Sequence, residues 1–383
     1  MTATSAPAVV ATRSRVTWID NLRILLTILV ILLHLSIGYG APGDWYYNEE
    51  GSVSTVSEIL LTLFVAINQA FFMGFFFMVS SYFGPASLRR KGAGPYLRDR
   101  FRRLGIPILV YALLVNPMLV AYLNVQDRGG AWWPVFRARY RDFIGVGPTW
   151  FLEALLLFSV GLVVFWRIRR PRQPAVEATA PSDRHIALAV VGLALLSFLV
   201  RIWLPVGWWL EPVHFQLAHF PQYLVMFALG VVAHQRGWFD AITQDQGRLW
   251  FRVVVGLIVI FPVLFAAGGG LDGSVDVFLG GLTWQQLAFA TWEQAMCLAM
   301  VVALVVFFRS RVTRQGRIGA AMSRGAYATY VFHAPVITVL AVILSPVQLD
   351  LGVKFLLVAP IAVAASFAVG FVMKRLPVAR DIL

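Results

Sequence analysis

The stretch DNLRILLTILVILLHLSIGY, residues 20–39, decides the fold of this chain. It has the length and apolar character of a helix that crosses a bilayer, yet it carries Arg23 at its charged start and His34 deep inside. The two residues are eleven positions apart, about three helical turns, so they share a face and lie roughly 16 Å apart along the axis. An ionisable side chain at that depth is costly, which makes His34 a candidate functional residue. The alternative is a snorkelling arginine and a histidine that bonds a neighbouring helix.

The composition extends this interpretation to the whole chain. Of 383 residues, 59% are hydrophobic and only 13% are charged, and apolar runs near twenty residues recur along the sequence. This pattern predicts an all-α polytopic membrane protein with about ten transmembrane helices. The predicted spans are 22–40, 59–83, 104–123, 150–166, 186–204, 212–233, 249–267, 282–308, 326–344 and 353–373. Residues 1–17 are predicted to be a mobile tail, residues 18–376 one transmembrane domain and residues 377–383 a C-terminal tail, with a flexible linker at 171–185.

The charges give this bundle a predicted orientation. The net charge is +13, and most Lys and Arg residues fall in alternate loops, whereas the other loops carry mainly Asp and Glu. The positive-inside rule therefore predicts that both termini are cytoplasmic. The exception is the 124–149 loop on the outer side, where four arginines alternate with aromatics, a pattern typical of an interfacial segment. The basic residues form no groove pattern, so we expect no nucleic-acid partner.

A cleaved signal peptide is the alternative for the first apolar run. His34 would interrupt its apolar region, and no clear A-x-A cleavage site follows. We therefore expect the run to be a retained first span.

A second cluster, YLRDRFRRLGIP, covers residues 96–107 and leads into the third span. Arg100 and Arg103 lie one helical turn apart, and guanidinium forks suit phosphate groups. The alternative is that they only anchor the helix at the cytoplasmic boundary.

The fourth predicted span begins with Trp150 and Glu153. A carboxylate just inside the interface can pair with a base or hold a sugar hydroxyl. Trp150 can equally be an aromatic-belt anchor.

The ninth span opens with Tyr327, Tyr330 and His333, spaced three apart and so roughly on one helical face. A functional cluster and a polar seam between helices are both consistent with this spacing.

The remaining histidines and the single cysteine do not form a metal motif. His214 and His219 are five positions apart, so a helix would point them to different faces, and Cys297 lies in an apolar run. We expect His219 to face the same cavity as His34, together with further intramembrane polar residues. Those residues are Asn68, Gln69, Asn116 and Glu293. The sequence contains no G-x-S-x-G, Walker or H-E-x-x-H motif, so neither an acyl-serine nor a metal is expected.

Taken together, these motifs resemble the acyltransferase-3 family of integral-membrane acyltransferases. The motifs are R-x10-H at Arg23 and His34, the Arg100 and Arg103 pair, W-F-L from Trp150, and Y-x-x-Y-x-x-H ending at His333. The resemblance spans about residues 16–373. The position of Glu153 differs from members whose acidic residue comes later.

The resemblance implies a bacterial plasma-membrane enzyme that moves an acyl group, in particular acetyl, from acyl-CoA to a hydroxyl of a glycan, lipid or small molecule. Such O-acetylation includes polysaccharide modification. The implied catalytic residues are His34 as general base, with Glu153 and His333. The implied acyl-CoA site comprises Arg23, Arg100, Arg103, Tyr327 and Tyr330, and the implied acceptor site comprises Trp150 and His219. A non-enzymatic exporter of a glycan or lipid-linked precursor is the main alternative, and a scaffold subunit is a weaker one.

Overall fold

The computed structural model describes residues 16–169, 178–377 and 379–383, and within them it contains ten helices long and apolar enough to cross a membrane. These residues form no strand, and Leu210 and Phe215 form an isolated bridge. The predicted all-α polytopic fold is therefore confirmed. The mobile-tail prediction for residues 1–17 falls almost wholly outside the described residues, and so do residues 171–177 of the predicted 171–185 linker. The last three residues of that linker already belong to the helix Asp183–Trp203.

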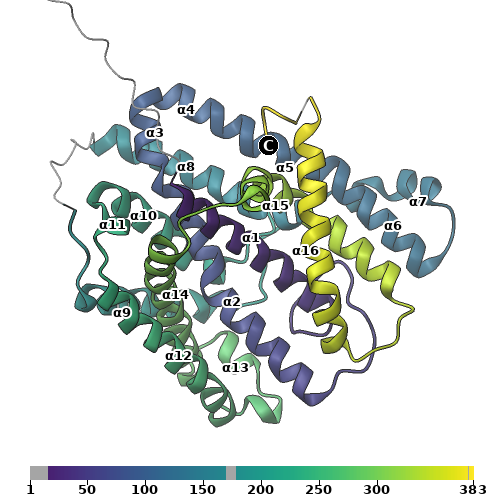
Figure 1. The fold of residues 1–383 in the computed structure, drawn as a ribbon. Coiled ribbons are helices and arrows are strands. Elements are labelled where there is room, and N and C mark those ends of the chain that lie inside the picture. Colours follow the sequence, from purple (N-terminus) through teal and green to yellow (C-terminus); the bar gives the residue numbers. More distant parts are fainter. Residues whose placement is uncertain (1–15, 170–177, 378) are drawn as a thin grey trace, which may run out of the picture.

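The bundle is built around four long helices (Figure 1). These are α1 (Thr17–Gly38), α2 (Thr55–Tyr82), α14 (Trp284–Arg311) and α15 (Arg317–Leu344). Helix α1 packs against the other three and against α16 (Leu351–Arg375). The remaining long helices are α8 (Trp150–Arg169), α9 (Asp183–Trp203), α10 (Phe220–Arg236) and α12 (Gln244–Ala267). The short ones are α3 (Gly84–Lys91), α7 (Trp132–Arg139), α11 (Trp238–Ala241) and α13 (Asp276–Leu279).

One span is helical but irregular. Helices α4 (Ala93–Arg100), α5 (Ile106–Val110) and α6 (Asn116–Arg128) are joined by π-helical turns at Phe101–Gly105 and Tyr111–Val115. Pro107 and Pro117 follow these turns and have no N–H to offer the carbonyls of Arg103 and Leu113. Tyrosines supply the missing donors, because Tyr327 donates to the Arg103 carbonyl and Tyr140 to the Leu113 carbonyl. The π turns and the tyrosines therefore satisfy backbone that the prolines disrupt.

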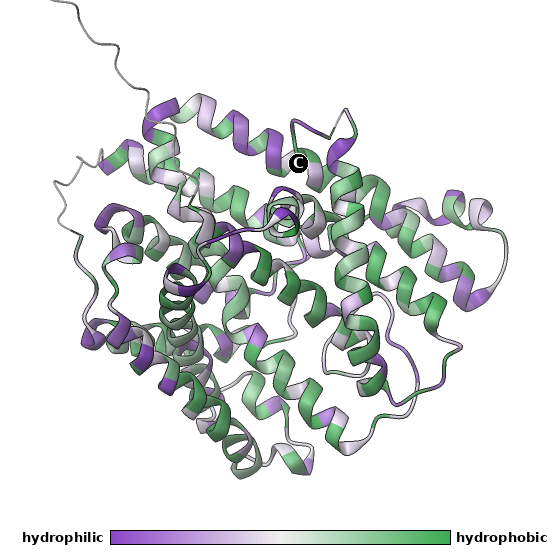
Figure 2. Ribbon diagram, viewed as in Figure 1, coloured by the Kyte–Doolittle hydropathy of each residue, from purple (hydrophilic) through white to green (hydrophobic). Residues whose placement is uncertain are grey.

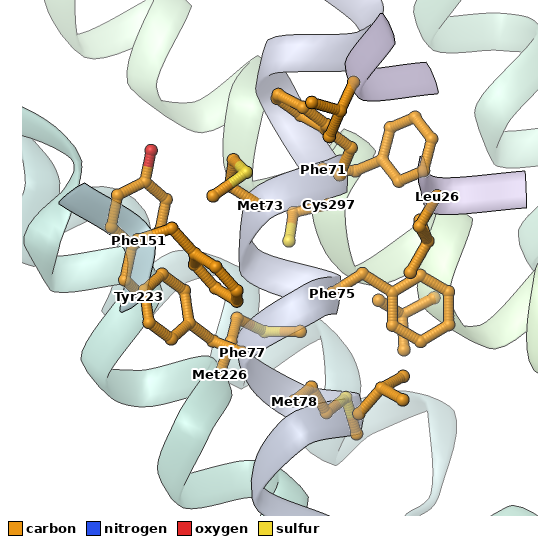
Figure 3. Close-up of a cluster of buried hydrophobic side chains, with 14 of the residues drawn as sticks. Leu26, Phe71, Met73, Phe75, Phe77, Met78, Phe151, Tyr223, Met226 and Cys297 are labelled. Atoms are coloured by element: carbon orange, nitrogen blue, oxygen red, sulfur yellow. The ribbon is translucent and has the colours of Figure 1, made fainter. Parts of the chain in front are cut away.

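The centre of the bundle is aromatic. Figure 3 shows Phe71, Phe75 and Phe77 of α2 beside Tyr223 of α10 and Cys297 of α14. The three phenylalanines are buried, so this Phe-rich run packs helices together. Figure 2 shows the complementary pattern, with apolar residues along the long helices and hydrophilic residues gathered at their ends.

The sixth predicted span begins later than the sequence suggests. Residues 212–216 lie outside the helix, because Leu210 and Phe215 exchange backbone hydrogen bonds and form a short hairpin. A single turn at Leu217–His219 then leads into α10. His214 therefore lies in this hairpin, where its ring stacks on Trp209 and its Nδ1 contacts Glu211.

Candidate functional site

Two histidines from opposite ends of the chain meet between α1 and α15. The Nε2 atom of His333 lies 3.2 Å from the Nδ1 atom of His34. His333 is completely buried, whereas His34 is only partly buried. The two residues are 299 positions apart, so the fold itself creates the pair.

The hydrogen bonds fix where the protons of this pair lie when both rings are neutral. His333 Nδ1 lies 2.6 Å from the backbone carbonyl oxygen of Tyr330, which can only accept, so Nδ1 carries a proton. His333 Nε2 then has a lone pair and accepts from His34 Nδ1–H. This assignment, inferred from the network, leaves a lone pair on His34 Nε2.

A tryptophan from the loop after α1 covers one face of this pair. The Trp45 ring stacks on the His34 ring with centroids 4.0 Å apart and an interplanar angle of 21°. Trp45 also lies 6.1 Å from the His333 ring. Sequence reasoning missed Trp45, because nothing in a polar loop signals that one of its aromatics returns to the bundle.

The loop that carries Trp45 is fastened at several points to the turn between α15 and α16. Lys354 Nζ lies 2.5 Å from Glu49 Oε1 and also contacts two backbone carbonyls in that turn, and both charged side chains are buried. Asp350 accepts from the Ser57 hydroxyl and the Ser54 N–H, each at 2.6 Å. These hydrogen bonds hold the pKa of Asp350 well below its ordinary value.

Tyr46, the neighbour of Trp45, connects the loop to the third span. Its hydroxyl donates to Asn116 and lies 3.3 Å from the Tyr111 hydroxyl. Burial raises the pKa of Tyr46 to about 12, so its hydroxyl stays protonated at neutral pH. Asn116 in turn donates to the Phe143 carbonyl. The side-chain amide of Asn116 therefore links the loop that carries Trp45 and Tyr46 to the third span and to Phe143.

Arg23 lies at the charged start of α1, as the sequence predicts. Its guanidinium is 3.6 Å from Asp20 and 5.3 Å above the Phe83 ring, and its side chain is 40% exposed. The side chain is therefore oriented but remains accessible to a charged ligand.

The other two predicted phosphate-binding residues lie at the start of the third span. Arg100 is over the Tyr96 ring at 5.2 Å, and Arg103 is exposed. Tyr327 joins this segment to α15 through the Arg103 carbonyl, and the Tyr330 hydroxyl donates to the Pro148 carbonyl. Both tyrosine hydroxyls thus contact backbone and hold α15 against its neighbours.

Trp150 and Glu153 lie in the first turn of α8, whose aromatic residues contact α10 and α15. Trp150 stacks on Tyr223 at 5.7 Å, and its neighbour Phe151 lies edge-on to Tyr330 at 5.5 Å. Glu153 is partly buried, and its Oε2 atom has no hydrogen-bond partner among the described residues.

His219 belongs to a different cluster, which also contains Arg201 and Glu293. Arg201 Nη2 lies 2.6 Å from Glu293 Oε2, and His219 Nδ1 lies 3.3 Å from Glu293 Oε1. Arg201 also donates to the Ala218 carbonyl. Sequence reasoning missed Arg201. The one available signal was Glu293, an intramembrane carboxylate that needs a buried cation.

Within the described ranges, no group of three His, Cys, Asp or Glu residues could hold a metal ion.

Comparison with known proteins adds independent findings. The acyltransferase-3 family profile, described as an acyltransferase domain, matches residues 16–375. Glucans biosynthesis protein C of Salmonella paratyphi B and of Salmonella dublin are each 28% identical over 191 residues. That alignment covers 48% of this chain and 46% of each relative, so the chain spans about half the length of the curated relatives it matches. No solved structure gave a significant match.

Proposed function

Since this chain belongs to the acyltransferase-3 family and is a multi-pass membrane acyltransferase, we propose that it transfers a short acyl group, in particular acetyl, from acyl-CoA to a hydroxyl. The observation that carries the proposal is the contact between His34 and His333. It leaves a lone pair on His34 Nε2 in a side chain that is only partly buried.

In the proposed reaction His34 is the general base. Its Nε2 takes the proton of the acceptor hydroxyl while the hydroxyl oxygen attacks the thioester carbonyl carbon. The carbon–sulfur bond then breaks, the ester is released, and the CoA thiolate takes the same proton from His34. No metal, oxidant or covalent enzyme intermediate is needed for this balance.

His333 has a positioning role in this scheme. Its Nε2 accepts from His34 Nδ1–H, which fixes the tautomer that presents the basic Nε2 and stabilises the imidazolium that forms. The Tyr330 carbonyl orients His333 in the same way. A second group that orients a catalytic histidine is a recurring solution in acyl transfer.

We propose that the phosphates of acyl-CoA bind at the charged end of the same helices. Arg23 lies in the second turn of α1 and is accessible, and Arg100 and Arg103 lie in the third span. The helical separation of Arg23 and His34, roughly 16 Å, is similar to the reach of a pantetheine arm. Tyr327 supports this arrangement because its hydroxyl holds the backbone of Arg103.

The acceptor is proposed to be a hydroxyl-bearing glycan, lipid or small molecule. The printed name of the Salmonella relatives makes a glucan the first acceptor to try. Trp150 and Glu153 at the start of α8 are the proposed acceptor contacts. An unpartnered carboxylate oxygen on Glu153 is consistent with a hydroxyl donor at that point. His219 is absent from this proposal because Glu293 and Arg201 already engage it.

The direct test is turnover of labelled acetyl-CoA by purified protein in nanodiscs, with and without a glucan oligosaccharide. We expect CoA release, which an acceptor accelerates, and label in the acceptor. If acetyl-CoA neither binds nor turns over while a glycan precursor still crosses the membrane, the proposed donor is wrong and the chain works as an exporter.

A further inference from the structure

Helix α16 packs against α15 and α1 (Figure 1). Residues of these three helices line a groove of about 690 Å³. Its lining is apolar and includes Leu32 of α1, Met322 of α15 and Phe367 of α16. Small residues, among them Ala364 and Ala368, leave the space open. The volume falls in the range of pockets that hold small organic ligands.

The position of the groove limits what can fill it. It is lined by three of the membrane-spanning helices, so the surrounding medium is hydrocarbon and not water. Its walls offer almost no polar surface for a sugar or nucleotide. The part of any occupant that lies inside the groove is therefore apolar, as a lipid acyl chain is.

One end of the groove is strongly basic. The Arg375 guanidinium lies 4.2 Å from the ring centroid of Phe371, which lines the groove. Arg317 is exposed and adjacent to Ile318, another lining residue. Lys374 contacts the Arg324 carbonyl and so holds the two basic helix ends together. Segments 317–324 of α15 and 370–375 of α16 together contain four Lys and Arg residues and no Asp or Glu.

From this charge and shape we propose a binding site for an anionic phospholipid. One acyl chain lies in the groove, and the headgroup phosphate lies between Arg317 and Arg375. Basic positions at the ends of transmembrane helices are suited to anionic headgroups, and each contributes roughly fivefold in affinity, the equivalent of about 1 kcal/mol. Because residues of α1, α15 and α16 line the groove, the bound lipid also stabilises the packing of these three helices.

The test uses delipidated protein in detergent, with lipid retention measured by native mass spectrometry and stability by thermal unfolding. Phosphatidylglycerol is compared with phosphatidylcholine of the same chain length. We expect roughly 25-fold stronger retention of phosphatidylglycerol by the wild type. Equal retention of the two lipids would overturn the proposal.

Two variants and one matched control separate the parts of the site. Arg317→Gln with Arg375→Gln is expected to abolish the preference for phosphatidylglycerol. Arg89→Gln with Arg90→Gln on α3 removes the same charge elsewhere and is expected to change nothing. Ala364→Phe, at an exposed position in the groove, is expected to fold normally and to lose retention of both lipids. Unchanged preference in the Arg317 and Arg375 variant would contradict the assignment.

A headgroup control distinguishes a lipid from a free anion. Glycerol phosphate without acyl chains is expected to give no thermal shift at concentrations where phosphatidylglycerol stabilises the protein. An equal shift would reduce the site to an anion site and overturn the lipid assignment. None of these measurements depends on enzyme activity.

Discussion

His219 and His34 belong to two separate side-chain clusters, which differ in whether a ring nitrogen remains available for a ligand. We call His219, Arg201 and Glu293 the closed cluster, and His34, His333 and Trp45 the open cluster. Around His219, the guanidinium of Arg201 and the carboxylate of Glu293 pair with each other, and all three side chains are at most 6% exposed. Around His34, the contacts are with His333 and Trp45, and the ring is partly exposed. The cluster around the Arg201–Glu293 ion pair is closed and holds helices together, whereas the open cluster around His34 has a ring nitrogen that can take up a proton. Burial within the membrane-spanning helices therefore does not by itself identify a catalytic histidine.

The largest expected effect is on the open cluster. His34→Ala removes the proposed base, and we expect acetyl transfer to fall about 10²- to 10⁴-fold, the usual contribution of a general base. His333 Nε2 loses its donor, which costs about 1–3 kcal/mol of unfolding free energy, but no charge is left unpaired, so the variant should still fold. His219→Ala is the matched control and should keep most of the activity. A larger loss of activity in His219→Ala than in His34→Ala would contradict the proposal that His34, and not His219, is the catalytic histidine.

Substitutions in the closed cluster should lower the free energy of unfolding. Arg201→Ala leaves Glu293 buried without its cation, and such a loss costs about 3–5 kcal/mol of unfolding free energy. Replacing both residues together, as Arg201→Met with Glu293→Leu, should recover most of this stability, because no charge then remains buried. Chemical or thermal unfolding in one detergent measures both. A double variant less stable than Arg201→Ala would show that the cluster does more than hold helices.

A smaller effect is expected at the second histidine of the open cluster. His333→Ala keeps the base but loses the acceptor that fixes its tautomer, so we expect kcat to fall about 10- to 100-fold with little change in KM. His333→Gln retains both an acceptor and a donor and should recover part of the loss. If the glutamine variant is no better than alanine, the hydrogen bond is not what matters.

The smallest effect concerns the loop that brings Trp45 to His34. Asp350 fastens that loop and has a lowered pKa, so its contribution to stability is present above the ordinary aspartate pKa and is lost as the pH falls. We expect Asp350→Asn to lower the unfolding temperature at neutral pH. The difference from wild type should shrink below about pH 4, where the Asp350 carboxylate of the unfolded wild-type chain begins to protonate while the folded one is still charged. A difference that is constant between neutral and acid pH would exclude the carboxylate charge as its cause.

Sequence reasoning identified the spans well, because uncharged apolar runs near twenty residues are typical of membrane-spanning helices and rare in water-soluble domains. It also selected His34 and His333 as candidate residues, since each is an ionisable group on an otherwise apolar helix, and the fold brings the two rings into contact. It did not identify Trp45 or Arg201. Trp45 reaches its partner only through the path of a loop, and Arg201 near the end of α9 looks like any interfacial arginine until α14 brings Glu293 beside it. Pairings between distant segments leave no local pattern, which is also why the start of the sixth span was misplaced.

His34 and His333 are proposed to act as one catalytic unit, and a double-mutant cycle measures whether they do. The measurement is acetyl transfer by His34→Ala, His333→Ala and the double variant in one assay. We expect the double variant to be no slower than His34→Ala, because His333 acts only through His34. Losses that multiply would show that the two histidines contribute separately and would exclude a single unit.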